Sequence, residues 1–174
     1  RTADRVNAYG PAIRKNYFKD AANVVCLGDP RMDVYVERAR HRVRSAHARP
    51  RIVIGAGGYD SVNLNGYLCQ EFDFLEGVME ALNRCRDNKR EFDITIKVRT
   101  NGYIEQYRSF CKEFYPGLPV EIVNSVPMIE VLGKADLYVS IYSQTHFEAA
   151  ILGIPSVYYK RDDCEWHPPF DGKS

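Results

Sequence analysis

The sequence predicts an α/β fold in which a parallel β-sheet carries helices on both faces. From residue 49 onward, short apolar runs of strand length alternate with longer segments whose apolar residues recur at helical spacing. Such alternation is typical of βαβ units, whose strands run parallel and whose sheet is covered on both sides. We therefore expect a Rossmann-like, doubly wound sheet of about five to six strands.

The composition is that of a globular chain with balanced charge. The 174 residues include 24 Lys and Arg and 23 Asp and Glu, which gives a net charge of +1. This balance argues against a polybasic nucleic-acid binder, and no apolar run approaches the roughly 18–20 residues of a membrane span. The five cysteines are scattered and form no C-x-x-C pair, so neither a disulfide framework nor a zinc ribbon is indicated. These features predict a reduced, cytoplasmic protein without a bound metal.

The first 48 residues are expected to form a segment between two domains. Apolar residues at helical spacing, broken by Gly10-Pro11, predict two short helices within residues 1–22. A strand over residues 23–27 follows, and then an arginine-rich helix over residues 34–46. A solvated surface is the favoured interpretation of that helix, over a nucleic-acid contact. Because the chain starts at Arg and ends on Gly-Lys-Ser, we expect it to be part of a longer protein.

The second segment, residues 49–174, is expected to be the Rossmann-like domain. Its strands are predicted over residues 51–54, 92–97, 120–123, 137–140 and 156–159. Its helices are predicted over residues 72–86, 103–114, 145–152 and a short stretch that begins within residues 124–128 and ends near residue 134. Ser125 is expected to cap the short helix, with Pro127 in its first turn.

Ligands of doubly wound sheets bind at the carboxyl ends of the strands. A long loop over residues 55–66 lies there, and its Gly57 and Gly58 could let a phosphate approach the backbone. The loop is not a dinucleotide fingerprint, because Asp60 replaces the third glycine, and no Walker Gly-Lys-Ser/Thr follows. A plain connection that needs tight turns remains the alternative interpretation.

The segment over residues 140–148 carries the strongest functional signal. Ser143 can cap the helix that follows, and the first helical turn offers free N–H groups to a phosphate or diphosphate. The hydroxyl of Thr145 could point the same way, and Glu148 would suit a pair of sugar hydroxyls. His146 could donate to a phosphate or sugar oxygen. The alternative is ordinary helix capping, with Glu148 as a partner of the helix dipole.

Other polar residues follow the remaining strands. Lys97 and Arg99 could meet phosphate charge or simply lie on the surface, and backbone groups around Val126 could bind the edge of a base. An acidic cluster over residues 162–165, with His167 nearby, matches no metal motif, so an exposed polar tail is favoured.

Several short motifs follow one another in order along the chain. They are the glycine-rich loop, Ser125-Val-Pro-Met128, Ala135-Asp-Leu-Tyr-Val-Ser140, Ser143-x-Thr-x-x-Glu-Ala149 and Leu152-Gly-x-Pro155. In this order they resemble the C-terminal, donor-binding half of a GT-B-fold glycosyltransferase of the bacterial capsule, teichoic-acid and surface-polysaccharide type. Residues 27–33, Leu-Gly-Asp-Pro-Arg-Met-Asp, are similar to a Gly-x-Pro-Arg-x-Asp segment near the junction of the two halves in that group.

The resemblance implies an enzyme whose C-terminal half binds a nucleotide-sugar donor. The residues it assigns to the donor are Ser143, Gln144 and Thr145 for the diphosphate, Glu148 for the ribose, and the backbone near Val126 and Met128 for the base. Many retaining enzymes of this fold carry a second Glu where this chain has Ser140, so the resemblance favours an inverting reaction.

The resemblance also implies what the whole protein would contain. The catalytic base and the site for a glycan or lipid-linked acceptor would lie in an N-terminal half that this chain lacks. No cofactor is implied besides the donor substrate, a metal is not required, and no nucleic acid takes part. The protein would be cytoplasmic, with the full-length form associated with the cytoplasmic face of the inner membrane.

Three other functions fit the same architecture. One is a hydrolysing sugar-nucleotide epimerase, and another is transfer of a polyol phosphate from a CDP-activated donor. The third is a module that binds a nucleotide or a partner without catalysis, since half of a cleft cannot close over its substrate.

Overall fold

The computed structural model confirms the predicted fold class. It describes residues 3–42, 48–57, 68–100, 102–141 and 143–159. Five parallel strands form one sheet in the order β5-β4-β3-β6-β7. Their bounds are Arg51–Gly55 (β3), Asp93–Lys97 (β4), Val120–Val123 (β5), Leu137–Ser140 (β6) and Ser156–Tyr158 (β7).

The order of the strands gives the sheet a point where its winding reverses. From β3 the chain adds β4 and β5 on one side, then crosses to add β6 and β7 on the other side. The switch point therefore lies between β3 and β6, at their carboxyl ends. In doubly wound sheets this is the place where ligands bind.

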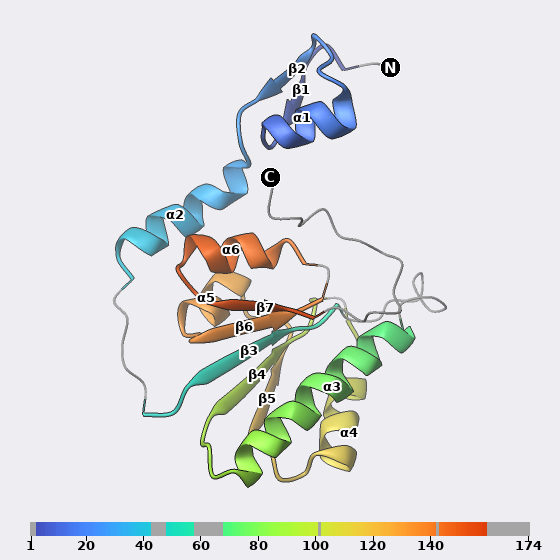
Figure 1. Ribbon diagram of the computed structural model, residues 1–174, viewed down its shortest axis with the longest axis vertical. Coiled ribbons are helices and arrows are strands. Elements are labelled where there is room, and N and C mark those ends of the chain that lie inside the picture. Colours follow the sequence, from blue (N-terminus) through green and yellow to red (C-terminus); the bar gives the residue numbers. More distant parts are fainter. Residues whose placement is uncertain (1–2, 43–47, 58–67, 101, 142, 160–174) are drawn as a thin grey trace.

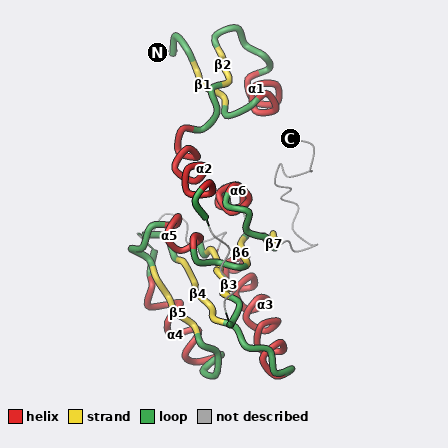
Figure 2. Tube along the Cα trace, turned by 90° about the vertical axis from the view of Figure 1, so that its left-hand side faces the viewer, coloured by secondary structure: helices red, strands yellow, loops and turns green. Residues whose placement is uncertain are grey.

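Helices cover both faces of the sheet, as Figures 1 and 2 show. The helices of the domain are α3 (Leu68–Asp87), α4 (Ile104–Phe114), α5 (Met128–Gly133) and α6 (Thr145–Ile151). Ile52 and Ile54 of β3 pack on one side with residues of α3 and α4, whereas Val53 faces the residues of α5 and α6. Burial on both faces explains why the central strands read as continuous apolar runs.

A small βαβ unit precedes this domain. It consists of β1 (Val6–Ala8), α1 (Pro11–Phe18) and β2 (Val24–Cys26), and its two strands pair in parallel. We call it the N-terminal unit. The prediction of two helices within residues 1–22 is therefore wrong for the first of them. The apolar residues there match a helical period only because the series runs from a strand into a helix that starts at Pro11.

An arginine-rich helix, α2 (Asp33–Arg40), joins the N-terminal unit to the domain, and a 3₁₀ turn over Pro30–Met32 precedes it. The expectation of a simply solvated helix is wrong on one face. Tyr35 is buried in the same cluster as Ala149 and Leu152 of the α6 region. Figure 1 draws α2, in light blue, against α6.

Arg42, which follows α2, adds polar contacts to this packing. Its guanidinium donates to the carbonyls of Leu152 and Ala135, each at 2.8 Å. These carbonyls follow the ends of α6 and α5, so one cation stabilises the carboxyl ends of two helices.

Two smaller expectations also differ from the structure. Pro127, not Ser125, is the residue before the first turn of α5, and the Ser125 hydroxyl donates to the Asn124 side chain instead. The long helix α3 begins at Leu68, four residues earlier than the apolar pattern indicates. In the described ranges, no helix combines the length and apolar character that crossing a membrane requires.

Candidate functional site

The centre of the candidate site is Gly55, the last residue of β3. Its register neighbours at the switch point are Lys97 of β4 and Ser140 of β6. The Ser140 hydroxyl donates to the Gly55 carbonyl at 2.7 Å and so ties the two strands together where they end. A Cβ atom on residue 55 would overlap the Tyr138 hydroxyl, so glycine makes room for that group.

Buried polar atoms without partners gather beside Gly55. They are the Tyr138 hydroxyl oxygen, Nε2 of His146 and Oε2 of Glu148, none of which has a hydrogen-bond partner in the described part of the chain. The Tyr138 side chain is fully buried, and the hydroxyls of Ser140, Ser143 and Thr145 lie near it. Because a buried polar group without a partner costs about 1–3 kcal/mol, such groups in one place indicate a binding site.

The His146 ring is held between aromatic neighbours. It meets the Tyr138 ring edge-on with 5.1 Å between centroids, and the Tyr158 ring lies 5.6 Å away on another side. Burial lowers the pKa of His146, while a hydrogen bond to the Ser140 backbone partly opposes that shift. The imidazole is therefore neutral at neutral pH, and its Nε2 can act as an acceptor.

The start of α6 differs from the expectation of free N–H groups. The N–H of Thr145 donates to the Ser143 hydroxyl at 3.1 Å, but the residue before the first turn of α6 is Gln144 and not the expected Ser143. The N–H groups of His146 and Phe147 donate to the carbonyls of Ser143 and Gln144. These hydrogen bonds engage the N–H groups of the first helical turn, which a diphosphate at this position would otherwise have used.

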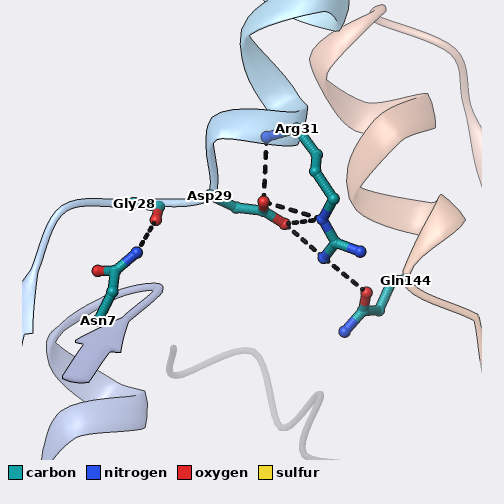
Figure 3. Close-up of polar contacts among 5 residues, drawn as sticks. All are labelled: Asn7, Gly28, Asp29, Arg31 and Gln144. Atoms are coloured by element: carbon teal, nitrogen blue, oxygen red, sulfur yellow. Dashed lines mark hydrogen bonds and ion pairs between the residues drawn. The ribbon is translucent and has the colours of Figure 1, made fainter. Parts of the chain in front are cut away.

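The 3₁₀ turn over Pro30–Met32 brings Arg31 to the start of α6. Arg31 donates through Nε and Nη2 to both carboxylate oxygens of Asp29, at 3.0–3.1 and 2.7 Å. The same Nη2 donates to the side-chain oxygen of Gln144 at 3.3 Å, as Figure 3 shows. The guanidinium also lies 5.7 Å from the centre of the Tyr9 ring.

The turn that carries Arg31 is fixed by Asn7 of β1. The Asn7 amide donates to the Gly28 carbonyl at 2.8 Å, and its oxygen accepts from the N–H of Leu27 at 2.9 Å. Gly28 has a φ of 77°, in the left-handed region that glycine adopts readily. Asp29 then caps the 3₁₀ turn by accepting from the N–H of Arg31.

Tyr35 of α2 approaches Glu148. Burial raises the pKa of the Tyr35 hydroxyl, and a hydrogen bond to the Glu148 carboxylate raises it further. Sequence reasoning named neither Arg31 nor Tyr35 as a site residue. Arg31 lies within the Gly-x-Pro-Arg-x-Asp resemblance over residues 27–33, which is the sequence signal that could have drawn attention to it, whereas Tyr35 carries no such signal.

Lys97 and Arg99 do not join this cluster. Lys97 is 7% exposed, and its Nζ donates to the carbonyls of Val98 and Asn124 at 2.8 and 2.7 Å. Asn124 follows β5, which lies on the opposite side of β4 from β3 and β6. Burial lowers the pKa of Lys97. Arg99 is exposed. Of the residues expected near the base, Val126 is exposed and Met128 is half-buried at the start of α5.

The start of the glycine-rich loop is held by a buried carboxylate that sequence reasoning missed. The N–H of Gly57 donates to Oε1 of Glu71 at 2.8 Å, and the Tyr107 hydroxyl donates to the same oxygen at 3.1 Å. Burial raises the pKa of Glu71, while these two hydrogen bonds partly oppose that shift. Gly58 and the rest of the loop to residue 67 lie outside the described residues.

Within the described ranges, potential metal ligands and cysteines form no second candidate site. No group of three or more His, Cys, Asp or Glu side chains could hold a metal ion there. Cys26, Cys85 and Cys111 are free thiols. The acidic cluster over residues 162–165 and His167 lie outside the described residues.

The chain was also compared with known proteins. No protein-family model matches it, and no curated protein sequence matches it.

Proposed function

We propose that this chain is the nucleotide-sugar-binding domain of a glycosyltransferase that acts in bacterial surface-polysaccharide synthesis. The observation that carries the proposal is the set of unpartnered buried atoms of Tyr138, His146 and Glu148 at the switch point. A ligand with hydroxyl and phosphate groups would supply the hydrogen bonds that these atoms lack.

Glu148 is the proposed ribose residue. Tyr35 engages its carboxylate from α2, and its Oε2 is left without a donor within the described ranges. A carboxylate oxygen accepts hydrogen bonds only, and the hydroxyls of a ribose are suitable donors. Ser143, Gln144 and Thr145 would lie along the phosphates, and the backbone near Val126 and Met128 would face the base.

In the intact enzyme, an acceptor hydroxyl would attack the anomeric carbon of the donor sugar. The bond from that carbon to the phosphate oxygen would break, and the oxygen would leave with the bonding electrons. Positive charge near the start of α6 would stabilise the leaving phosphate. The base that takes the acceptor proton would come from outside this chain, as would the site for a glycan or lipid-linked acceptor.

The test is binding of nucleotides to this chain. UDP, CDP, GDP, CMP and ADP are titrated by calorimetry, with amide NMR shifts to locate the bound ligand. We expect saturable binding of one nucleotide with the largest shifts over residues 143–148. Failure of all five to bind a chain that is folded by circular dichroism would contradict the proposal.

A substitution of Glu148 tests whether the nucleotide binds at the proposed site. We expect Glu148→Gln to weaken nucleotide binding by about 1–3 kcal/mol, because the neutral amide is a poorer acceptor for the ribose hydroxyls. Glu130→Gln is the matched control, since Glu130 is an exposed carboxylate on α5. Equal losses in both variants would remove the ribose role from Glu148.

A further inference from the structure

Phosphate recognition at the start of α6 requires donors that the local backbone does not supply. The N–H groups of Thr145, His146 and Phe147 already donate within the chain. Lys97 is buried, and its Nζ donates to the carbonyls of Val98, which follows β4, and Asn124, which follows β5. A diphosphate beside Gln144 would therefore need its positive charge from another element.

Arg31 is a cation that reaches the start of α6, where it contacts Gln144. Asp29, whose side chain is only 10% exposed, holds two of its three guanidinium nitrogens in a fixed plane. Nη2 reaches Gln144, and Tyr9 lies against the guanidinium from the N-terminal unit. The Nη1 nitrogen makes no hydrogen bond to any described residue, and the Arg31 side chain is 63% exposed.

We propose that Arg31, supplied by the segment that precedes the domain, binds the phosphate groups of the nucleotide at the start of α6. This inference rests on the proposed function. Asp29 orients the guanidinium so that its Nη1 edge stays open toward a ligand, and the weak 3.3 Å contact with Gln144 is exchanged for a phosphate oxygen. A planar guanidinium suits this task because two of its N–H groups can meet two phosphate oxygens together.

The rival explanation is that Arg31 merely links two segments of the chain. The Arg31 side chain is 63% exposed, so its pair with Asp29 contributes little to stability, and a structural role predicts small and uniform effects on all ligands. A phosphate-binding role instead predicts an effect that grows with the number of phosphates on the ligand.

The experiment measures affinity along a phosphate series. Uridine, UMP and UDP, and in parallel cytidine, CMP and CDP, are titrated into the 174-residue chain and its variants. The variants are Arg31→Ala, Arg31→Lys and the control Arg40→Ala, which removes an exposed arginine of α2 that pairs with Glu37. Nucleoside affinity within each variant serves as the internal check on its fold.

We expect the wild-type chain to bind one diphosphate at least about tenfold more tightly than its nucleoside. Arg31→Ala should reduce that ratio by about tenfold with nucleoside affinity unchanged, and Arg31→Lys should fall between the two. Arg40→Ala should leave the ratio as in wild type.

The failing outcomes separate the two proposals. If Arg31→Ala keeps the wild-type ratio, or loses nucleoside and diphosphate affinity by the same factor, the role of Arg31 is overturned while the donor site stands. If the folded wild-type chain binds none of these ligands and neither GDP nor ADP, the proposed function itself is overturned.

Discussion

Gly55 is the residue on which the geometry of the switch point depends most directly. A methyl group there would overlap the Tyr138 hydroxyl and lie 3.0 Å from the Ser140 hydroxyl oxygen. Both neighbours are fully buried, so neither can withdraw to solvent. The prediction is that Gly55→Ala lowers the free energy of unfolding by about 1–3 kcal/mol in urea titrations.

A second substitution tests the cause of that loss. Combined with Tyr138→Phe, which removes the overlapped oxygen, Gly55→Ala should cost less than it does alone. Gly133→Ala in α5 is the control, because its Cβ would come no closer than 3.6 Å to the flexible end of Arg38. A loss of similar size at Gly133, or no recovery in the double variant, would refute the steric explanation.

His146 gives the fold a dependence on pH. Burial lowers its folded-state pKa below the usual 6.5, so the unfolded chain takes up a proton that the folded chain resists. This contribution to stability is present above pH 6.5 and is lost as pH falls through that value. We expect acidification from pH 7.5 to 5.5 to lower the free energy of unfolding, by at most about 1.4 kcal/mol per pH unit from this group.

The matched variants are His146→Phe, which keeps an aromatic ring beside Tyr138, and His41→Gln, which replaces an exposed histidine of the α2 region. Urea unfolding at both pH values should show a smaller pH effect in His146→Phe only. If His146→Phe retains the full wild-type pH effect, another group is responsible.

At the scale of elements, Arg42 determines how firmly α2 is attached to the domain. It contributes two charge-assisted hydrogen bonds to the carbonyls of Ala135 and Leu152, both partly buried. Arg42→Met keeps the aliphatic stem and removes these bonds, so we expect a loss of about 1.5–3 kcal/mol in the free energy of unfolding.

Hydrogen exchange should place that loss at residues 131–135 and 149–154, which span the carboxyl ends of α5 and α6. Arg40→Met is the comparison, since its exposed pair with Glu37 should contribute no more than about 1 kcal/mol. Equal destabilisation by the two variants would argue against a specific anchoring role for Arg42.

Most elements of the domain could be predicted because their signals are local. The apolar runs of β3, β4 and β6 and the turns after them are set by residues next to one another in the sequence. The three-residue strand β1 could not be separated from α1, because its partner β2 lies about 18 residues further along the chain. Short strands are defined by pairing, which a local pattern does not contain.

The candidate site was only partly predictable for the same reason. Ser143, His146 and Glu148 follow one strand end and could be grouped by position alone. Arg31 reaches Gln144 across 113 residues, and Glu71 reaches back 14 residues to Gly57. Such contacts depend on how separate elements pack, so neither residue could be assigned from spacing. The contacts of Lys97 could not be predicted either, because its Nζ donates to the backbone carbonyls of Val98 and Asn124 and the second of these lies 27 residues away.

At the scale of the whole molecule, the main question is where the folding unit begins. The contacts of β1, α1 and β2 are chiefly with one another, whereas α2 packs on α6 and buries Tyr35 in the domain core. A boundary at residue 48 would leave that core surface without its cover. We therefore predict a folding unit that begins just before Asp29.

Two truncations test this boundary. Removal of residues 1–28 should change the free energy of unfolding by less than about 1 kcal/mol, because a two-stranded unit adds little packing to the domain. Removal of residues 1–42 should cost at least about 3 kcal/mol, since it uncovers the surface under Tyr35 and removes the hydrogen bonds of Arg42. Urea titrations monitored by far-UV circular dichroism measure the free energy of unfolding of both truncated chains. If the two truncated chains are equally stable, α2 is a linker and the domain boundary lies at residue 48. A helix that completes the core would make the removal of residues 1–42 costly while the removal of residues 1–28 stays nearly neutral.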